Sequence, residues 1–192
     1  DGLLLDCYKA TVTGWDKVTD LSGGDALSGS QKVRTITYNF QAGGARGINL
    51  YIVDGQNAAI EWDGSTATAI AGSLAGVPFL VAAFTNHLFL GFANGSLVAS
   101  ATGDPTEWTT GATEISMGDD LTALQQLPGG VFAIMCRKQI DLLYGNDSSD
   151  WQKKTHSETA GAVTDSVQVL GDALMLDGSN VTFLQRTQAF GD

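Results

Sequence analysis

Short runs of apolar residues, separated by glycine, proline and polar turns, recur along this chain. The clearest series consists of Leu121–Leu127, Val131–Met135 and Ile140–Tyr144, which are joined by a Pro-Gly-Gly turn and by a polar turn. Each run has the length of a β-strand, and none is long enough to bury one face of a helix. The pattern predicts an antiparallel meander in this part of the chain.

The meander is repeated with a nearly constant period. The first strand of each copy ends on a large apolar residue, and these residues, Phe40, Phe84, Leu127 and Leu170, are 44, 43 and 43 positions apart. Four tryptophans, Trp15, Trp62, Trp108 and Trp151, follow one another at intervals of 47, 46 and 43. A period near 43 with three or four short strands per copy is typical of the blades of a β-propeller. These eight residues are therefore the predicted structural anchors of the repeat.

The periodicity predicts one all-β domain over residues 1–192, β-propeller-like, with about four to five blades of antiparallel meanders. The copies are 1–30 (partial), 31–75, 76–118, 119–160 and 161–192 (partial). The last copy supplies the early strands of a blade and the first copy the later ones, so the two ends could complete one blade between them. The alternative is a fragment of a larger ring, which the start at Asp1 without methionine also favours.

Local patterns predict individual strands and turns. Val33–Phe40 alternates as a strand does, and Ala10–Trp15 is expected to be a single strand. Val77–Phe84 is expected to pair with His87–Phe92 through the two-residue turn Thr85-Asn86, and Asn94-Gly95 to close the next hairpin.

Three apolar residues followed by an aspartate form a second local pattern. It occurs at Leu3–Asp6, Tyr51–Asp54 and Leu174–Asp177. An aspartate at such a position can accept hydrogen bonds from the backbone N–H groups of the following turn.

Composition agrees with stacked sheets and argues against nucleic-acid binding. Hydrophobic residues make up 43% of the chain and charged residues only 16%, and 24 glycines supply turns. With 21 acidic against 10 basic residues the net charge is −11. Gripping DNA through its phosphates needs clustered Lys and Arg, so this role is disfavoured.

The cysteines and the length of the apolar runs limit which class of protein this chain can belong to. Cys7 and Cys136 are far apart, and each lies in or beside an apolar run, which favours two buried free thiols over a disulfide. Because the sequence opens at Asp1 with no basic n-region, we expect no signal peptide here, and no apolar run approaches the roughly 18 residues of a membrane span.

The residues offer little for catalysis or for a cofactor. His87 lies in a strand run and His156 in a polar stretch, and neither has the spacing of a metal-binding motif. A nucleophile elbow of the GxSxG type is absent from the sequence. We therefore expect no enzyme, no metal and no cofactor. Arg46, in the loop 41–47, is a candidate contact residue, although a solvated arginine is the simpler interpretation.

Two patterns allow a ligand-binding alternative. The pair Asp119-Asp120, together with Asp63, Asp104, Asp147 and Asp150 near the tryptophans, could supply the two carboxylates of a propeller glycosidase. Aspartate is also a standard turn residue, and this interpretation is favoured. The periodic tryptophans could stack on sugars, but packing between adjacent blades is favoured for them too.

One stretch resembles a known family. It begins with the string Ala99–Trp108, which has the motif S-x-x-G-D-P-x-x-W, followed by Ile115 and Gly118–Leu124. Val131–Ile140 follows, with the basic pair Arg137-Lys138. The closing segment runs from Thr159 to Phe183 and contains Gly161, Ser166, Leu176, Asp177-Gly178 and Phe183. This pattern resembles tail proteins of bacteriophages, and the resemblance covers roughly residues 80–186.

The resemblance implies a structural virion protein of the tail nozzle or head-to-tail connector class in short-tailed phages, of the tail tubular or packaged-DNA stabilisation type. A propeller-like domain of such proteins assembles, commonly as a hexamer, around the passage for DNA ejection. The implied partners are other copies of the chain, the portal or adaptor and other tail proteins, with DNA passing unbound. The implied location is the virion, after synthesis in the host cytoplasm. The alternatives are a receptor- or carbohydrate-binding propeller module and, third, a propeller glycosidase.

Overall fold

The computed structural model describes residues 8–17, 32–40, 47–70, 76–108, 114–178 and 180–187. Over these ranges the protein is all-β, as predicted: seventeen strands form five antiparallel sheets, and one helical turn of four residues accompanies them. Predictions for Leu3–Asp6, Cys7 and Arg46 concern residues outside these ranges.

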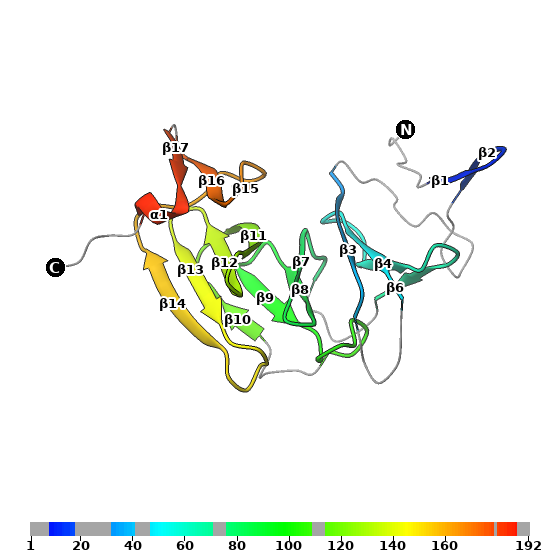
Figure 1. Cartoon of the computed structure of the whole chain (residues 1–192), viewed down its shortest axis with the longest axis horizontal. Coiled ribbons are helices and arrows are strands. Elements are labelled where there is room, and N and C mark those ends of the chain that lie inside the picture. The colour runs from blue at the N-terminus through cyan, green and yellow to red at the C-terminus, as the bar shows by residue number, and fades with distance from the viewer. Residues whose placement is uncertain are drawn as a thin grey trace. The chain divides into compact units, whose positions relative to one another are not determined.

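The strands of each sheet are neighbours in chain order (Figure 1). The N-terminal hairpin consists of β1 (Tyr8–Thr11) and β2 (Gly14–Lys17). The first four-stranded sheet contains β3 (Arg34–Tyr38), β4 (Asn49–Val53), β5 (Ile60–Trp62) and β6 (Ala67–Ala69). The second contains β7 (Leu80–Phe84), β8 (His87–Gly91), β9 (Ser96–Ala99) and β10 (Glu114–Ser116).

The C-terminal part of the chain forms two further sheets. A third four-stranded sheet contains β11 (Leu121–Leu127), β12 (Val131–Cys136), β13 (Ile140–Tyr144) and β14 (Gln152–Ser157). The last sheet has three strands, β15 (Gln168–Leu170), β16 (Asp172–Asp177) and β17 (Asn180–Phe183), and the helical turn α1 (Leu184–Thr187) follows it.

The sheets coincide with the copies seen in the sequence. The copies 31–75, 76–118 and 119–160 each contain one four-stranded sheet, the copy 161–192 contains the last sheet, and the copy 1–30 contains the N-terminal hairpin. The repeat therefore corresponds to one antiparallel meander. How the meanders are arranged around one another stays a prediction, as does the single domain.

The prediction of one strand over Ala10–Trp15 is wrong. The chain turns at Val12 and Thr13, and β1 pairs back onto β2 with Ala10 opposite Trp15. The Thr11 hydroxyl stabilises the turn by donating a hydrogen bond to the Gly14 carbonyl oxygen at 3.2 Å, and Val12 at the turn is fully exposed.

The two-residue turn at Thr85-Asn86 is confirmed. Both residues have positive φ, 44° and 64°, as a type I′ turn requires. The strand before the turn is shorter than predicted and starts at Leu80 rather than Val77. Pro78 lacks the N–H group that a strand position would need, and its carbonyl oxygen accepts a hydrogen bond from Gly55 instead.

The chain forms two compact units, Asp1–Phe92 with Ala99–Thr110 and Ala93–Val98 with Gly111–Asp192. In the first unit Phe40 is fully buried, with its ring centroid 4.5 Å from that of Tyr38 and 5.1 Å from that of Tyr51. In the second unit a buried cluster joins sheet β11–β14 to the last sheet and α1; its members are Ala133, Met135, Ile140, Ala162, Ala173, Met175 and Leu184.

Two irregularities interrupt the pairing within sheet β11–β14. The register shifts between Leu121 and Ala123 on β11, which leaves Thr122 as an extra residue. A second shift, where Ile140 and Asp141 face Ser157 and Thr155, leaves His156 as an extra residue on β14. The Thr122 hydroxyl donates to the Met135 carbonyl oxygen at 3.1 Å, and His156 Nε2 lies 2.8 Å from the Leu184 carbonyl oxygen.

Candidate functional site: the Ser100–Trp108 loop and the Arg137 turn

The loop from Ser100 to Trp108, which carries the S-x-x-G-D-P-x-x-W motif, is fastened to the start of β8. The Leu88 N–H group donates to Ser100 Oγ at 2.9 Å, and the Gly103 N–H group donates to the Asn86 carbonyl oxygen at 2.6 Å. His87 Nδ1 lies 2.7 Å from the Ser100 carbonyl oxygen. The motif therefore closes over the turn between β7 and β8.

The ring of His87 is committed to this loop. Its side chain is 1% exposed. Because the Ser100 carbonyl can only accept, Nδ1 carries the proton, and Nε2 is the acceptor for the Thr102 hydroxyl at 3.2 Å. With both nitrogens engaged in backbone and side-chain bonds, His87 holds the loop in place rather than offering a free base.

The remaining residues of the motif shape the loop itself. Gly103 has a φ of 74°, which favours glycine. Asp104 Oδ1 accepts the N–H group of Thr106 at 3.0 Å and its hydroxyl at 2.7 Å. Trp108 ends the motif with 9% of its surface exposed, and its indole N–H has no hydrogen-bond partner among the described residues. Ser100, Gly103 and Asp104 thus each stabilise the conformation of this loop.

The aspartates near the other tryptophans bind their own turns, which confirms their interpretation as turn residues. Asp63 Oδ1 accepts the N–H groups of Ser65 at 2.8 Å and Thr66 at 2.7 Å. These bonds, the one from Thr66 first, hold the pKa of Asp63 below its ordinary value. Asp150 Oδ1 accepts the N–H groups of Asn146 and Asp147, both at 2.8 Å.

The aspartates that follow three apolar residues, Asp54 and Asp177, accept different kinds of hydrogen bond. Asp54 Oδ1 accepts the N–H groups of Gln56 at 2.9 Å and Asn57 at 2.8 Å, as predicted for a turn. Asp177 instead accepts the N–H group of Gly161 at 3.3 Å, a residue that precedes it by 16 positions. The same short motif therefore stabilises a local turn in one copy and a longer connection in another.

In the second unit, the pair Asp119-Asp120 ties the start of β11 to the Arg137 turn, defined as residues 137–139 between β12 and β13. Asp119 Oδ2 accepts the Lys138 N–H group at 2.8 Å, and Asp119 Oδ1 accepts the Asp120 N–H group at 2.8 Å. Asp120 Oδ2 lies 3.1 Å from the Arg137 guanidinium. Both carboxylates thus hold turns, which agrees with the favoured interpretation and gives the glycosidase alternative no support.

Cys136 and Asp141 are fully buried beside the Arg137 turn. Cys136 is a free thiol, as predicted. Burial, followed by the negative charges of Asp119 and Asp141, raises the pKa of Cys136 to about 12. The Asp141 carboxylate is bound by Gln139 Nε2 at 2.9 and 3.0 Å and by Lys153 Nζ at 3.0 Å.

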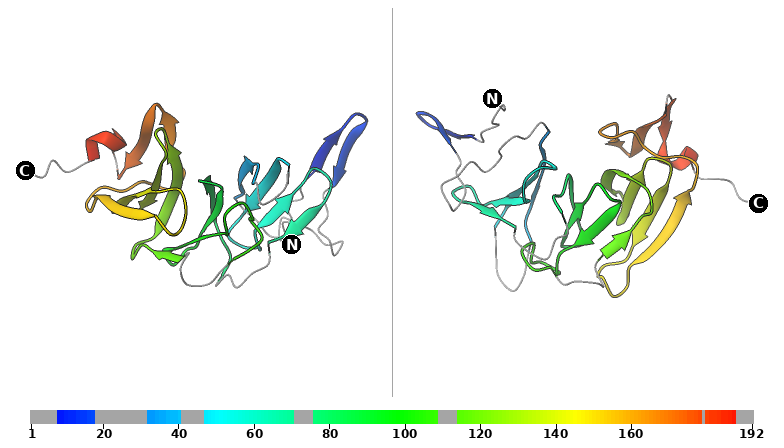
Figure 2. Two further views of the ribbon diagram at one scale, coloured as in Figure 1. Left: turned by 60° about the horizontal axis from the view of Figure 1, so that its bottom comes forward. Right: turned by 180° about the vertical axis from the view of Figure 1, so that it is seen from behind.

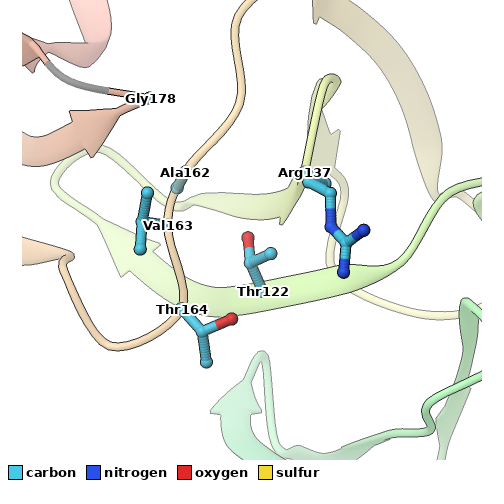
Figure 3. Close-up of a pocket in the computed structure, with 6 residues that line it drawn as sticks. All are labelled: Thr122, Arg137, Ala162, Val163, Thr164 and Gly178. Carbon is cyan, nitrogen blue, oxygen red and sulfur yellow. The ribbon is translucent and has the colours of Figure 1, made fainter.

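A cavity of about 220 Å³ lies next to this turn, and its lining consists of Thr122, Arg137, Ala162, Val163, Thr164 and Gly178. Figure 3 shows Thr122 between the segment 162–164 and the Arg137 side chain. The cavity is smaller than the roughly 300–1,000 Å³ of typical ligand pockets. The Arg137 guanidinium in its lining is paired with Asp120, and the Thr122 hydroxyl already donates to the Met135 carbonyl oxygen. Its lining combines no nucleophile with a base.

The predicted repeat anchors fall into three groups by burial. Phe40, Phe84 and Trp108 are buried. Trp62, Leu127 and Trp151 are half-buried. Trp15 and Leu170 are exposed, at 72% and 71%. The two exposed anchors lie on the N-terminal hairpin and on the last sheet, where the chain has its incomplete copies.

One polar network was missed by the sequence interpretation. Glu61 Oε1 accepts hydrogen bonds from Asn49 Nδ2 at 2.7 Å and from the Tyr51 hydroxyl at 2.8 Å, and all three residues are buried. The available signal was a lone carboxylate inside the run Ala58–Trp62 of otherwise apolar residues. A buried charge of this kind needs partners on the neighbouring strand.

Over the described ranges, His, Cys, Asp and Glu side chains do not gather in groups of three or more that could hold a metal ion. Nor does any helix there have the length and hydropathy needed to cross a membrane. Comparison with protein-family models and with curated proteins finds no match to this chain.

Proposed function

We propose that this chain is a structural component of a bacteriophage virion, part of the wall around the DNA passage in a tail nozzle or head-to-tail connector. The observation that supports this most is that each copy of about 43 residues folds as its own antiparallel meander. The motif that carries the resemblance to phage tail proteins stabilises one of these meanders through hydrogen bonds to the start of β8.

The proposal includes a propeller-like arrangement of the meanders. Every residue of β8 is buried, and in β12 the five residues after Val131 are buried. Successive residues of a strand point to opposite faces, so these strands must be covered on both faces. Sheets stacked face to face around an axis provide this cover, which supports the proposed arrangement.

The charge supports a passage that does not retain DNA. A net charge of −11 gives a surface that repels phosphate groups. In the proposed assembly the partners are other copies of this chain in a ring, the portal or adaptor and further tail proteins. Such a protein acts through its interfaces and needs no catalytic residue or cofactor.

The experiment is to purify the chain and follow its mass by sedimentation velocity over a wide range of concentration, with negative-stain imaging of the assembled fraction. We expect ring-shaped oligomers whose population grows with concentration. A monomer at every concentration, with no density for this chain in a ring of the particle, would contradict the proposal.

A further inference from the structure

The two faces of the last sheet differ. Paired residues of antiparallel strands lie on the same face, so the register places Ala173, Met175 and Thr182 on one face. Ala173 and Met175 are buried in the core cluster that this sheet shares with sheet β11–β14. The centre of this face is therefore already packed within the chain, and only its margin, with Val169 and Asn180, is exposed.

The opposite face of the last sheet, which we call the outer face, is mostly apolar and accessible. It carries Leu170, Leu174, Leu176, Val181 and Phe183, together with Gln168 and Asp172. Leu170 and Val181 are each 71% exposed and Phe183 is 39% exposed, while Leu174 and Leu176 are half-buried. Contiguous apolar residues on an exposed sheet face usually mark an interaction surface.

The N-terminal hairpin, drawn in blue in Figure 2, has two different faces as well, which follow from its register. The register puts Lys9 with Asp16 on one face and Tyr8, Ala10, Trp15 and Lys17 on the other. Lys9 Nζ donates a hydrogen bond to the Gly64 carbonyl oxygen and lies 5.9 Å from the ring centroid of Trp62. The Lys9 face is thus attached to the first unit of its own chain.

The other face of the hairpin, which we call the aromatic face, remains accessible. Tyr8 is 53% exposed and Trp15 is 72% exposed. Aromatic side chains supply large contact areas in interfaces at low conformational cost. The chain therefore carries two different accessible apolar sheet faces, one at each of its incomplete copies.

We propose that the aromatic face of one copy packs on the outer face of a second copy, head to tail. The charges agree, because the aromatic face carries Lys17 and no carboxylate, whereas the outer face carries Asp172 and no basic residue. Two different surfaces on one chain make a heterologous contact, which repeats from copy to copy and yields rings when the rotation closes. The inference rests on the proposed assembly role and names the segments that would join the copies.

The test uses the complete chain and two single variants, Trp15→Glu and Val181→Glu, followed by sedimentation velocity. Each variant buries a charge in the proposed contact, and we expect the concentration for half-assembly to rise about tenfold or more, as for a hot-spot residue. Mixed together, the variants should form a one-to-one dimer and nothing larger, because only the hairpin of Val181→Glu and the outer face of Trp15→Glu remain competent.

The matched control is Ile48→Glu, which changes another apolar residue of similar exposure, 69%, outside both faces. It should assemble like the unmodified chain. Far-ultraviolet circular dichroism and thermal unfolding verify that all three variants fold, as expected for substitutions at exposed sites.

Other results would contradict either the proposed contact or the proposed structural role. If the unmodified chain assembles and both variants assemble equally well, the proposed contact is wrong while the structural role stands. If only Val181→Glu is impaired, the outer face packs on its own counterpart in another copy. If the unmodified chain remains a monomer at every concentration, the proposed assembly role is wrong. If, in addition, both variants unfold at a lower temperature than the unmodified chain, the aromatic face packs on the outer face of the same chain.

Discussion

At Gly161 the connection between β14 and β15 passes directly over the Arg137 turn. A Cβ atom at this position would lie 2.3 Å from the Arg137 carbonyl oxygen and 2.4 Å from that of Cys136. Both atoms belong to the backbone and cannot move aside cheaply. We predict that Gly161→Ala lowers the free energy of unfolding by about 1–3 kcal/mol, as overpacking of a tight site does.

The control for this prediction is Gly14→Ala, because nothing lies within 4 Å of a Cβ atom built at Gly14. Urea unfolding followed by tryptophan fluorescence measures both variants. Equal stability of Gly161→Ala and the unmodified chain would mean that the connection is not held against the turn.

Cys136 gives a second prediction for a single residue. With a pKa raised from 9.0 to about 12 and no exposed surface, the thiol reacts poorly with alkylating reagents in the folded state. At pH 8 about one thiol in ten thousand is ionised. In a Cys7→Ser variant, labelling by iodoacetamide should therefore require unfolding by urea, and mass spectrometry detects the adduct. Rapid labelling without urea would contradict the burial of this residue.

The same raised pKa sets a pH dependence. A thiol that stays protonated in the folded state contributes stability that is complete below pH 9 and declines as the pH rises towards 12. Stability of the unmodified chain should fall over this interval, and a Cys136→Ala variant, although less stable overall, should show a smaller decline. Equal slopes of the unfolding free energy against pH would refute this.

Among the elements, the hairpin β7–β8 has a turn in which one residue, Thr85, is poorly suited to positive φ. Thr85 is β-branched and has a φ of 44°, a conformation that Asn adopts far more readily. We predict that Thr85→Asn raises the free energy of unfolding by about 0.5–1 kcal/mol, because a strained backbone position is relieved. Thr35→Asn, the same change at an exposed position inside β3, should be neutral or destabilising. Thermal unfolding of the two variants distinguishes these effects.

The elements also show what a sequence can predict here. Residues 121–144 alternate so regularly between apolar strands and turns, one Pro-Gly-Gly and one polar, that β11 and β13 begin and end where the pattern indicates. Ala10–Trp15 was misjudged because one apolar residue, Val12, does not decide between a strand and a turn without knowledge of its neighbours in space. The Glu61 network and the extra residues Thr122 and His156 depend on partners from other elements of the fold, which no local pattern encodes.

For the whole molecule, the excess of acidic residues predicts no retention of DNA. Fluorescence anisotropy of a labelled duplex should remain unchanged on addition of this chain even at low salt, where phosphate contacts are strongest. A basic DNA-binding protein in the same assay is the positive control. A salt-sensitive rise in anisotropy would show a cationic surface that the composition does not suggest.

The same charge governs how copies come together. Each added copy brings a net charge of −11, so mutual repulsion opposes assembly. Raising the salt from 0.1 to 1 M shortens the screening length from about 10 Å to about 3 Å. The attraction between surface lysines and aspartates that is lost at the same time is worth at most about 1 kcal/mol per pair. We therefore expect sedimentation velocity to show stronger assembly at high salt, and weaker assembly there would mean that ion pairs dominate the contact.

The extra residues in sheet β11–β14 have a consequence for how this chain can change in evolution. Removing one residue from a regular strand inverts the orientation of every side chain beyond the gap. Thr122 and His156 lie outside the regular pairing, so loss of either one leaves the remaining strand aligned with its neighbour. These two positions are where a three-nucleotide deletion in the gene would preserve the sheet, at the cost of one tether to the backbone of Met135 or Leu184.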